Sequence, residues 1–332
     1  MAELLRVEAL RVRFRAVGAV RALLEGIRDP FIDAVLEVGF ALGEGETLGL
    51  VGESGSGKTT LVRAIIGLVP LAAGSIRFRG TPLVGLSDRA YRPIRRQIGM
   101  IFQDPVASLS PRKTVRSLLA EPFRIHGVRE RPLDEEVSRL LRVVGLPDGL
   151  RGAYPHELSG GQARRVGIAR ALALAPRLVI ADEPTAGLDV SVQGDVLNLM
   201  NELRERLGLS YLIVTHNLPV IRHVSDRLAI MYMGRFVEQG PTATVFARPA
   251  HPYTVGLLNA VPQPDPDRRR ARLELAGEVP SLRHRPPGCE FHTRCPFAEA
   301  RCRVEAPAYR RIAAGRWVRC HFPLNGFDAA PA

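Results

Sequence analysis

Lysine is nearly absent from this chain of 332 residues, because only Lys58 and Lys113 are lysines among its 46 basic residues. Long apolar runs are absent as well. No stretch approaches the roughly 18–20 apolar residues that cross a bilayer, so we expect no membrane-spanning helix. Residues 1–10 carry Glu3, Arg6 and Glu8 among their apolar positions, which excludes a secretory signal core and predicts a cytoplasmic protein.

The basic residues outnumber the acidic ones and leave a net charge of +12. Such an excess is compatible with a nucleic acid, an anionic membrane surface or a nucleotide as ligand. The basic residues do not form one stripe with interleaved aromatic residues, so we expect no nucleic-acid partner.

Short apolar strands alternate with helical patterns along residues 1–260, which predicts an α/β fold with a mainly parallel sheet. Residues 4–14 alternate apolar and polar positions and predict a strand or hairpin arm. Residues 16–30 predict either a short helix or an inserted loop. Prolines accumulate after residue 260, so we expect a domain boundary there and a small, loop-rich extension over residues 261–332.

A glycine-rich loop separates a predicted strand at residues 47–51 from a predicted helix at residues 61–68. Its residues fit G-x-x-x-x-G-K-[ST], the phosphate-loop motif: Gly52, Glu53, Ser54, Gly55, Ser56, Gly57, Lys58 and Thr59, followed by Thr60. Glycines let backbone N–H groups surround phosphate oxygens, and the helix N-terminus adds a positive dipole end. Lys58 is expected to reach the β- and γ-phosphates, and the Thr59 hydroxyl to ligate Mg²⁺.

The chain has 44 arginines and two lysines, and one of the lysines, Lys58, lies in the phosphate loop. The shape of the two cationic groups explains why a lysine is found there. A compact ammonium fits between backbone amides and phosphate oxygens, whereas the planar guanidinium of arginine does not. A plain glycine-rich turn would not need the lysine. A dinucleotide site would need G-x-G-x-x-G, which the residues after Gly57 do not provide.

Two adjacent carboxylates, Asp182 and Glu183, end the apolar run at residues 178–181. An isolated pair of this kind is usually a solvated strand end. With a phosphate loop upstream, Asp182 is expected beside Mg²⁺ and Glu183 beside the attacking water. A general base there is worth roughly 10²–10⁴ in rate.

The segment from residue 158 to 162 resembles the signature motif of ABC-type ATPases, and its last four residues are Ser159, Gly160, Gly161 and Gln162. The resemblance implies a P-loop ATPase domain over residues 1–260, with a parallel-sheet core, an antiparallel β arm and a helical subdomain at about residues 104–170. It also implies that this loop caps the γ-phosphate held by a facing subunit, so that two ATP molecules lie within a head-to-tail dimer.

The resemblance assigns further residues. Gln103 corresponds to the Q-loop glutamine, a Mg²⁺ ligand together with Thr59 and Asp182, and Asp189 to the D-loop aspartate. His216 corresponds to the switch histidine that contacts the γ-phosphate, although Asn217 follows it where relatives commonly have Asp. Phe14 is the best match for the aromatic residue that stacks on adenine, with core packing as its alternative role.

Residues 103–112, 188–193 and 251–254 resemble the ATPases of oligopeptide and dipeptide importers. The resemblance implies an ATP-hydrolysing subunit on the cytoplasmic face of the bacterial inner membrane. Its partners would be a second ATPase chain, which in this subfamily is usually a different homologue, two permeases and a periplasmic or extracellular peptide-binding protein. Nickel, glutathione or an oligosaccharide remain alternative cargoes, and a non-transport ATPase acting on nucleic acid or ribosomes is a remote alternative.

No cysteine occurs in the first 288 residues, and all four lie in the extension at Cys289, Cys295, Cys302 and Cys320. In a reducing compartment such clustering favours a metal or cluster site over disulfides. The spacing C-x₅-C-x₆-C-x₁₇-C lacks the C-x₂-C knuckles of common zinc ribbons. The resemblance to dipeptide-importer ATPases favours a 4Fe–4S cluster, while zinc or no metal remain open, with His292 and His321 as reserve ligands.

Overall fold

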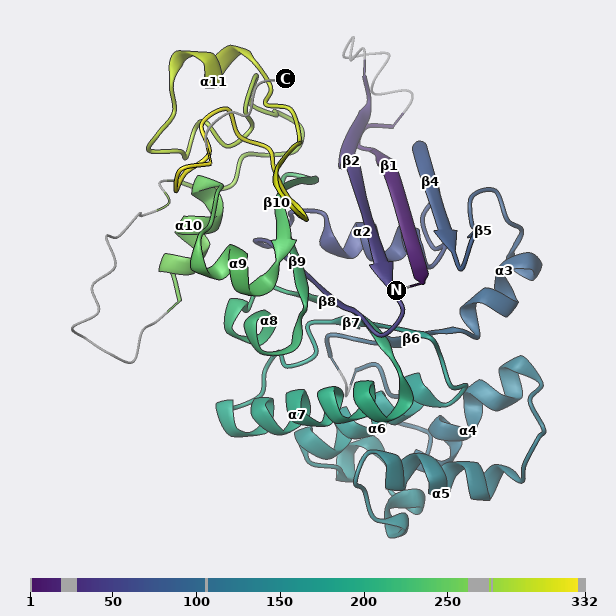
Figure 1. Ribbon diagram of the computed structural model, residues 1–332. Helices are drawn as coiled ribbons and strands as arrows, with labels where there is room; N and C mark the ends of the chain where they lie inside the picture. Colours follow the sequence, from purple (N-terminus) through teal and green to yellow (C-terminus); the bar gives the residue numbers. More distant parts are fainter. Residues whose placement is uncertain (1, 19–28, 105–106, 262–274, 276, 328–332) are drawn as a thin grey trace. The chain divides into compact units, whose positions relative to one another are not determined.

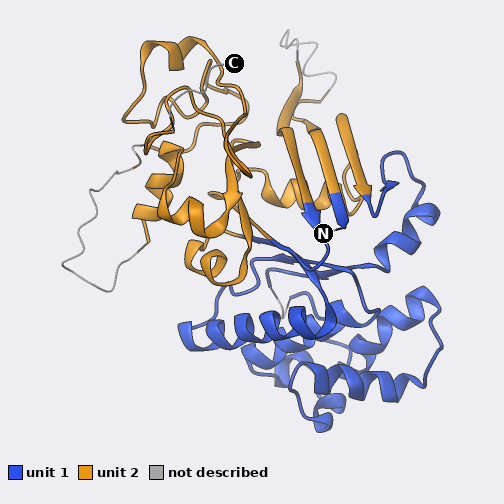
Figure 2. Cartoon of the chain, in the orientation of Figure 1, with its two compact units in different colours: residues 1–5, 42–47, 78–214 blue, residues 6–41, 48–77, 215–332 orange. Residues whose placement is uncertain are grey.

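The computed structural model describes residues 2–18, 29–104, 107–261, 275 and 277–327 (Figure 1). The chain divides into two compact units (Figure 2). Unit 1 comprises residues 1–5, 42–47 and 78–214, and unit 2 comprises residues 6–41, 48–77 and 215–332. Among the helices of the described ranges, none is both long and apolar enough to cross a membrane.

Unit 1 contains three neighbouring parallel strands, in the order β6 (Ile98–Ile101), β7 (Leu178–Asp182) and β8 (Ser210–Thr215). Every residue of β7 and β8 is buried, which explains their nearly continuous apolar sequences. Ile101 pairs with Ala181, and the segments that follow β6 and β7 therefore leave the sheet at the same edge. The apolar run noted at residues 178–181 is the strand β7, in agreement with the predicted parallel α/β sheet.

Helices make up the rest of unit 1, and the central group packs α4 (Val115–His126), α5 (Leu133–Val143) and α6 (Gly160–Leu172) against one another (Figure 1). The others are α3 (Asp88–Arg95), α7 (Val190–Leu207) and the 3₁₀ turns η1 (Asp148–Gly152) and η2 (Pro155–Glu157). The first turn of helix α7 is capped by the Asp189 side chain, and its buried apolar residues begin only at Val196.

Unit 2 contains β3 (Thr47–Val51), which runs parallel to β9 (Arg227–Tyr232). A tight turn with positive φ at Met233 and Gly234 leads to the antiparallel β10 (Arg235–Pro241), as predicted. Strand β12 (Arg316–Val318) pairs with β10, and β11 (Arg310–Ala313) pairs with β12. The cysteine-containing extension therefore adds two strands to this sheet, which its proline-rich composition did not predict.

The N-terminal arm places β2 (Phe31–Gly43), β1 (Glu3–Arg15) and β4 (Ala73–Phe78) side by side, and β5 (Thr81–Pro82) follows. The backbone N–H groups of Ala16 and Val17 donate to the Pro30 carbonyl, so the two ends of the segment from 16 to 30 meet. The helix predicted there falls largely on residues 19–28, outside the described ranges.

The described part of unit 2 also contains the helices α2 (Lys58–Ile65), α8 (Leu218–Val224), α9 (Thr242–Ala247), α10 (Pro252–Asn259) and α11 (Ala300–Val304). Helix α2 starts three residues before the predicted residue 61, because the last residues of the phosphate-loop motif already form its first turn. That early start brings the free N–H groups of the helix to the loop.

Candidate active site

The phosphate loop, residues 52–59, connects β3 to α2 in unit 2. The buried Lys58 begins α2, and its Nζ donates to the Gly52 carbonyl at 2.6 Å and to the Glu53 carbonyl at 2.8 Å. A third contact, at 3.3 Å, joins Nζ to the Ser56 hydroxyl. The ammonium is therefore held inside the curve of the loop, where backbone N–H groups and a helix N-terminus favour an anion.

Two glycines of the phosphate loop lie against neighbouring backbone. Gly57 has a φ of 103°, and a Cβ on it would lie 2.4 Å from the Ala34 carbonyl oxygen of β2. A Cβ on Gly52 would lie 2.3 Å from the Met231 carbonyl oxygen of β9. Only glycine allows this close approach, so the loop is shaped by strands far away in the sequence.

The two predicted carboxylates end β7 in unit 1, and both side chains are buried. Glu183 has a φ of 50°, and its N–H donates to the Val214 carbonyl at 2.7 Å. The left-handed region is unfavourable for a residue with a Cβ, and such strain is often found at functional positions. Gln103 follows β6 at the same edge and is exposed.

Arg164 of α6 holds the turn after β7, and no motif in the sequence indicated this role. Only 2% of the residue is exposed. Its guanidinium donates to the carbonyls of Glu183 at 3.3 Å and Ala186 at 2.7 Å, and also to the Pro184 carbonyl. Burial lowers the pKa of Arg164 from its usual value. Three backbone acceptors thus fix the shape of the turn that carries Glu183.

The signature segment forms the N-terminus of α6. The Ser159 hydroxyl accepts a hydrogen bond from the Gln162 N–H at 3.2 Å, and the Gln162 side chain accepts one from the Ser159 N–H at 3.0 Å. This reciprocal capping box leaves Ser159 and Gly160 exposed to solvent, with Gly161 half-buried. The segment therefore offers a preformed helix N-terminus that is open to a partner.

Asp189 and Asn217 each cap a helix. Asp189 accepts from the Val192 N–H at 2.9 Å at the start of α7, beside Val190, which is 86% exposed. Asn217 accepts from the Val220 N–H at 3.3 Å at the start of α8, immediately after the exposed His216. An aspartate at position 217 would accept the same bond, so the departure from the family pattern preserves this cap.

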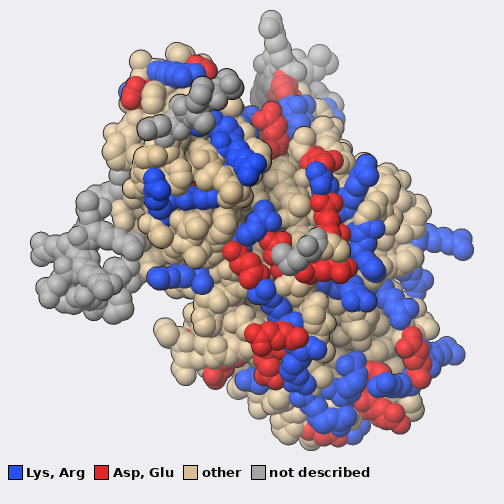
Figure 3. All heavy atoms as spheres, viewed as in Figure 1, with Lys and Arg blue, Asp and Glu red and all other residues tan. Residues whose placement is uncertain are grey.

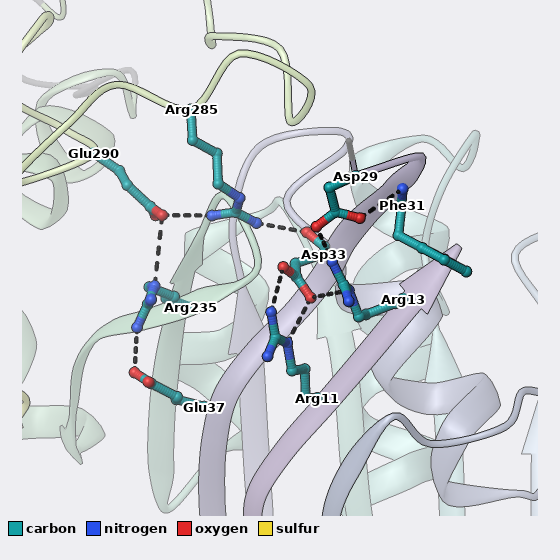
Figure 4. Close-up of polar contacts among 9 residues, drawn as sticks. All are labelled: Arg11, Arg13, Asp29, Phe31, Asp33, Glu37, Arg235, Arg285 and Glu290. Carbon is teal, nitrogen blue, oxygen red and sulfur yellow. Dashed lines mark hydrogen bonds and ion pairs between the residues drawn. The ribbon is translucent and has the colours of Figure 1, made fainter. Parts of the chain in front are cut away.

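Phe14 lies near the end of β1 with 43% of its surface exposed, so it is not a core residue. The arm around it is crossed by ion pairs (Figure 4). Asp33 of β2 accepts from Arg11 at 2.7 and 2.9 Å, and this pairing lowers the pKa of the Asp33 carboxyl. Arg13 lies 3.2 Å from the same carboxylate. These contacts join β1 to β2 in the arm that carries Phe14.

The four cysteines line a single pocket of the extension, together with His251, His292 and His321 and several apolar residues. All four are free thiols. Burial raises the pKa of Cys289 to about 11 and that of Cys320 to about 12. Within the described residues, however, no group of three or more His, Cys, Asp or Glu side chains is arranged to hold a metal ion.

The segment at the start of α10 is built around a buried glutamate. Glu238 of β10 accepts from the N–H groups of Ala250 and His251, both at 2.9 Å, and pairs with the buried Arg316 of β12. The His251 Nδ1 then accepts from the Tyr253 N–H at 3.0 Å and caps α10. Burial lowers the pKa of His251 to about 3, so this ring is neutral at physiological pH. His251 therefore has a structural role at the start of α10.

Comparison with known proteins identifies the chain. Residues 35–186 match the ABC transporter family, and residues 237–302 match the C-terminal region of oligopeptide/dipeptide transporters. The oligopeptide transport ATP-binding protein AppF of Bacillus subtilis (strain 168) is 48% identical over 296 residues, which are 87% of this chain and 89% of the relative. The chain belongs to the ATP-binding proteins of ABC transporters.

Other members of the family agree. A probable peptide ABC transporter ATP-binding protein of Sinorhizobium fredii, y4tS, is 45% identical over 88% of this chain and 83% of its own length. The ATP-binding cassette MJ0796, solved as a dimer bound to ADP and Pi, has a TM-score of 0.63 and 27% identity over 72% of this chain and 99% of its own. CbiO1 from Clostridium perfringens has a TM-score of 0.62, with 27% identity over 74% of this chain and 92% of its own.

Membership in this family makes the protein an ABC ATPase that uses ATP and Mg²⁺ and works with membrane permeases and a substrate-binding protein. The predicted fold class and enzyme class are confirmed. The roles that the motifs assign to individual nucleotide-site residues remain predictions. On the face shown in Figure 3, Lys and Arg side chains are interspersed with Asp and Glu rather than collected in one patch.

Proposed function

We propose that this chain binds and hydrolyses MgATP. Lys58 and the N–H groups of the phosphate loop bind the β- and γ-phosphates, and Thr59, Gln103 and Asp182 ligate Mg²⁺. The observation that carries this proposal is the position of the Lys58 ammonium, held by loop carbonyls within the curve of the loop. Ser54, Gly55 and Thr60 belong to the same nucleotide-binding segment.

Glu183 is the general base for the attacking water in this proposal, and His216 contacts the γ-phosphate. Two observations support the assignment of Glu183. It is buried at the end of β7, and Arg164 holds the turn that carries it. The exposure of His216 on the loop after β8 leaves its ring accessible to a ligand. Phe14 stacks on adenine, and its exposed ring on the arm supports this role.

The chain is the ATP-hydrolysing subunit of an ABC importer for peptides. In the detailed arrangement that we propose, it pairs head-to-tail with a second, homologous ATPase chain. Ser159 and the N–H groups of Gly160 and Gly161 then cap the γ-phosphate on the partner, with Gln162 as the cap of the helix and Asp189 at the same interface. The exposed N-terminus of α6 supports this arrangement.

Two permeases and a periplasmic peptide-binding protein complete the proposed complex. The subunit then lies on the cytoplasmic face of the inner membrane, with the segment after Gln103 transmitting motion to a permease. In this proposal, residues 1–260 form the ATPase domain, and about 104–170 form its helical subdomain. Residues 261–332 form the extension. Copurification from membranes, followed by identification of the bound chains, tests the partners.

A single substitution tests the general base. Glu183→Gln keeps the size of the side chain and removes its basicity, so the assembled complex should lose ATP turnover by roughly 10²–10⁴ while nucleotide binding persists. The variant should also trap a nucleotide-bound dimer, measured by size-exclusion chromatography with ATP. Unchanged turnover would refute the assignment of Glu183.

We further propose that Cys289, Cys295, Cys302 and Cys320 bind a metal, either a 4Fe–4S cluster or Zn²⁺. Their shared pocket and the thiolate preference of both groups support the proposal. The group would supply folding energy to an extension that has little apolar core of its own. Among the described residues, these cysteines do not form a group of three or more ligands arranged to hold a metal ion.

The metal proposal is tested on protein purified without oxygen. Cys295→Ser should lower the iron or zinc content, remove any cluster absorbance and lower the melting temperature. The ratio of iron to zinc in the unmodified protein decides between the two groups. Unchanged iron, zinc and thermal stability in the variant would refute a structural metal site.

A further inference from the structure

Glu53 is the second residue of the phosphate loop, and the C-terminal extension holds its carboxylate. Arg294 donates from Nη1 to Glu53 Oε2 at 2.7 Å and from Nη2 to Oε1 at 3.1 Å. The two residues are separated by 241 positions in the sequence. The Arg294 side chain is 6% exposed and the Glu53 side chain 30% exposed, so this is a bidentate pair largely shielded from water.

The backbone of Glu53 is held from the same side. Its N–H donates to the hydroxyl of Tyr253 at 3.0 Å. Tyr253 packs with Tyr232 and Phe291, at ring-centroid distances of 4.8 and 5.5 Å, and the Arg294 guanidinium lies 5.9 Å from the Tyr232 ring. Aromatic residues of β9, α10 and the extension thus fix both ends of the contact with the loop.

A carboxylate in this position is unfavourable for the loop's proposed ligand. ATP carries several negative charges, and a glutamate in the loop that surrounds them repels the nucleotide unless its charge is neutralised. A buried arginine with a planar fork is well suited to this, because it binds both carboxylate oxygens and its charge does not titrate. The pair therefore does more than attach the extension.

We propose that Arg294 is a positioning residue for ATP: it neutralises Glu53 and orders the first turn of the phosphate loop, so nucleotide affinity depends on the chain's own C-terminal extension. This inference rests on the proposed function of the phosphate loop. Another arginine of the extension makes its contacts without touching that loop. Arg285 donates to Glu290 and to the Asp33 carbonyl of β2, both at 2.5 Å (Figure 4).

The test is nucleotide binding by the full-length chain, measured by calorimetric titration with ATP. Arg294→Met should raise the Kd about tenfold or more, because the Glu53 charge is then uncompensated beside the ligand. Glu53→Gln in the Arg294→Met background should restore the Kd to within about threefold of wild type. Arg285→Met, which removes a half-buried arginine of the extension that does not contact the loop, should leave the Kd within about twofold.

The salt dependence of the Kd shows whether Arg294 acts through its charge or only through its packing. Added NaCl screens the repulsion, so the difference in Kd between Arg294→Met and wild type should shrink as ionic strength rises. A merely structural arginine would give a difference that salt does not change. If Arg294→Met does not fold, Arg294→Gln takes its place. This variant keeps a polar partner for Glu53 and removes the positive charge, so the Kd for ATP should rise and the rise should shrink with added salt.

The outcomes distinguish this inference from the one it rests on. Normal ATP binding by Lys58→Ala would overturn the proposed phosphate site itself. Loss of binding in Lys58→Ala together with a wild-type Kd for Arg294→Met would overturn only the role of Arg294. Failure of Glu53→Gln to restore binding in the Arg294→Met background would do the same.

Discussion

The phosphate loop and the turn after β7 are both held by a buried arginine from another part of the chain, but the arginines bind different acceptors. Arg164 donates to three backbone carbonyls in the turn that carries Glu183. Arg294 donates to the carboxylate of Glu53 in the phosphate loop. Carbonyls are neutral, so Arg164 acts on shape. A carboxylate is charged, so Arg294 acts on shape and on the local field.

The two loops also differ in how much space surrounds their glycines. Gly57 is enclosed by the backbone of β2, whereas Gly187, in the segment after Glu183, has no other atom within 4 Å of where a Cβ would lie. Both have positive φ, so both favour glycine. Gly57 is therefore the more constrained of these two glycines, as expected of a position in a segment whose N–H groups must be fixed before the ligand binds.

The largest expected effect comes from Lys58→Arg, which tests whether the constrained loop accepts any cation. The guanidinium is too broad for the space in which Nζ contacts Gly52 and Glu53, so ATPase activity should fall by about 10²-fold or more. Arg206→Lys, which preserves an exposed pair with Glu202, is the control and should be unaffected. Wild-type turnover in Lys58→Arg would show that charge alone suffices.

The next effect compares alanine at the two glycines. Gly57→Ala should abolish nucleotide binding, because its Cβ meets the Ala34 carbonyl in addition to the strained φ. Gly187→Ala meets no atom and carries only the cost of a positive φ, about 1–2 kcal/mol. Nucleotide titration and thermal unfolding measure both variants. Equal losses of binding would contradict the difference in constraint.

Removal of Arg164 should lower the free energy of unfolding, whether or not Glu53 in the phosphate loop is charged. Arg164→Met leaves three carbonyls without this donor, so the free energy of unfolding should fall by about 2–3 kcal/mol. Denaturant unfolding measures the loss. Because the acceptors are neutral, Glu53→Gln should not restore stability to Arg164→Met. Restoration by that change would mean that the two arginines share one electrostatic role.

The smallest effect concerns a third loop, after β8, which is held by a side-chain cap and not by an arginine. Asn217→Ala removes the bond from the Val220 N–H, so the free energy of unfolding should fall by about 1 kcal/mol. Asn217→Asp should retain full stability, as measured by thermal unfolding. Full stability in Asn217→Ala would show that the cap is not needed to hold the segment beside His216.

Much of the fold followed from local patterns. The parallel strands at residues 98–101, 178–182 and 210–215 were predictable because strands buried on both faces consist of apolar runs. The strands β11 and β12 were not, because each is short, rich in arginine and stabilised by pairing that begins at β10. Helix α3 buries only Tyr91 and Ile94, which is too weak a pattern to predict.

The sequence by itself determined the chemistry of this protein: its motifs name the family, the nucleotide and the residues expected to act on it, because phosphate and Mg²⁺ demand particular side chains at particular spacings. The tertiary structure decided what holds those residues. Arg164 and Arg294 are two among 44 arginines in the sequence, and nothing local distinguishes them. Their roles arise from contacts across 19 to 241 residues, which only packing creates.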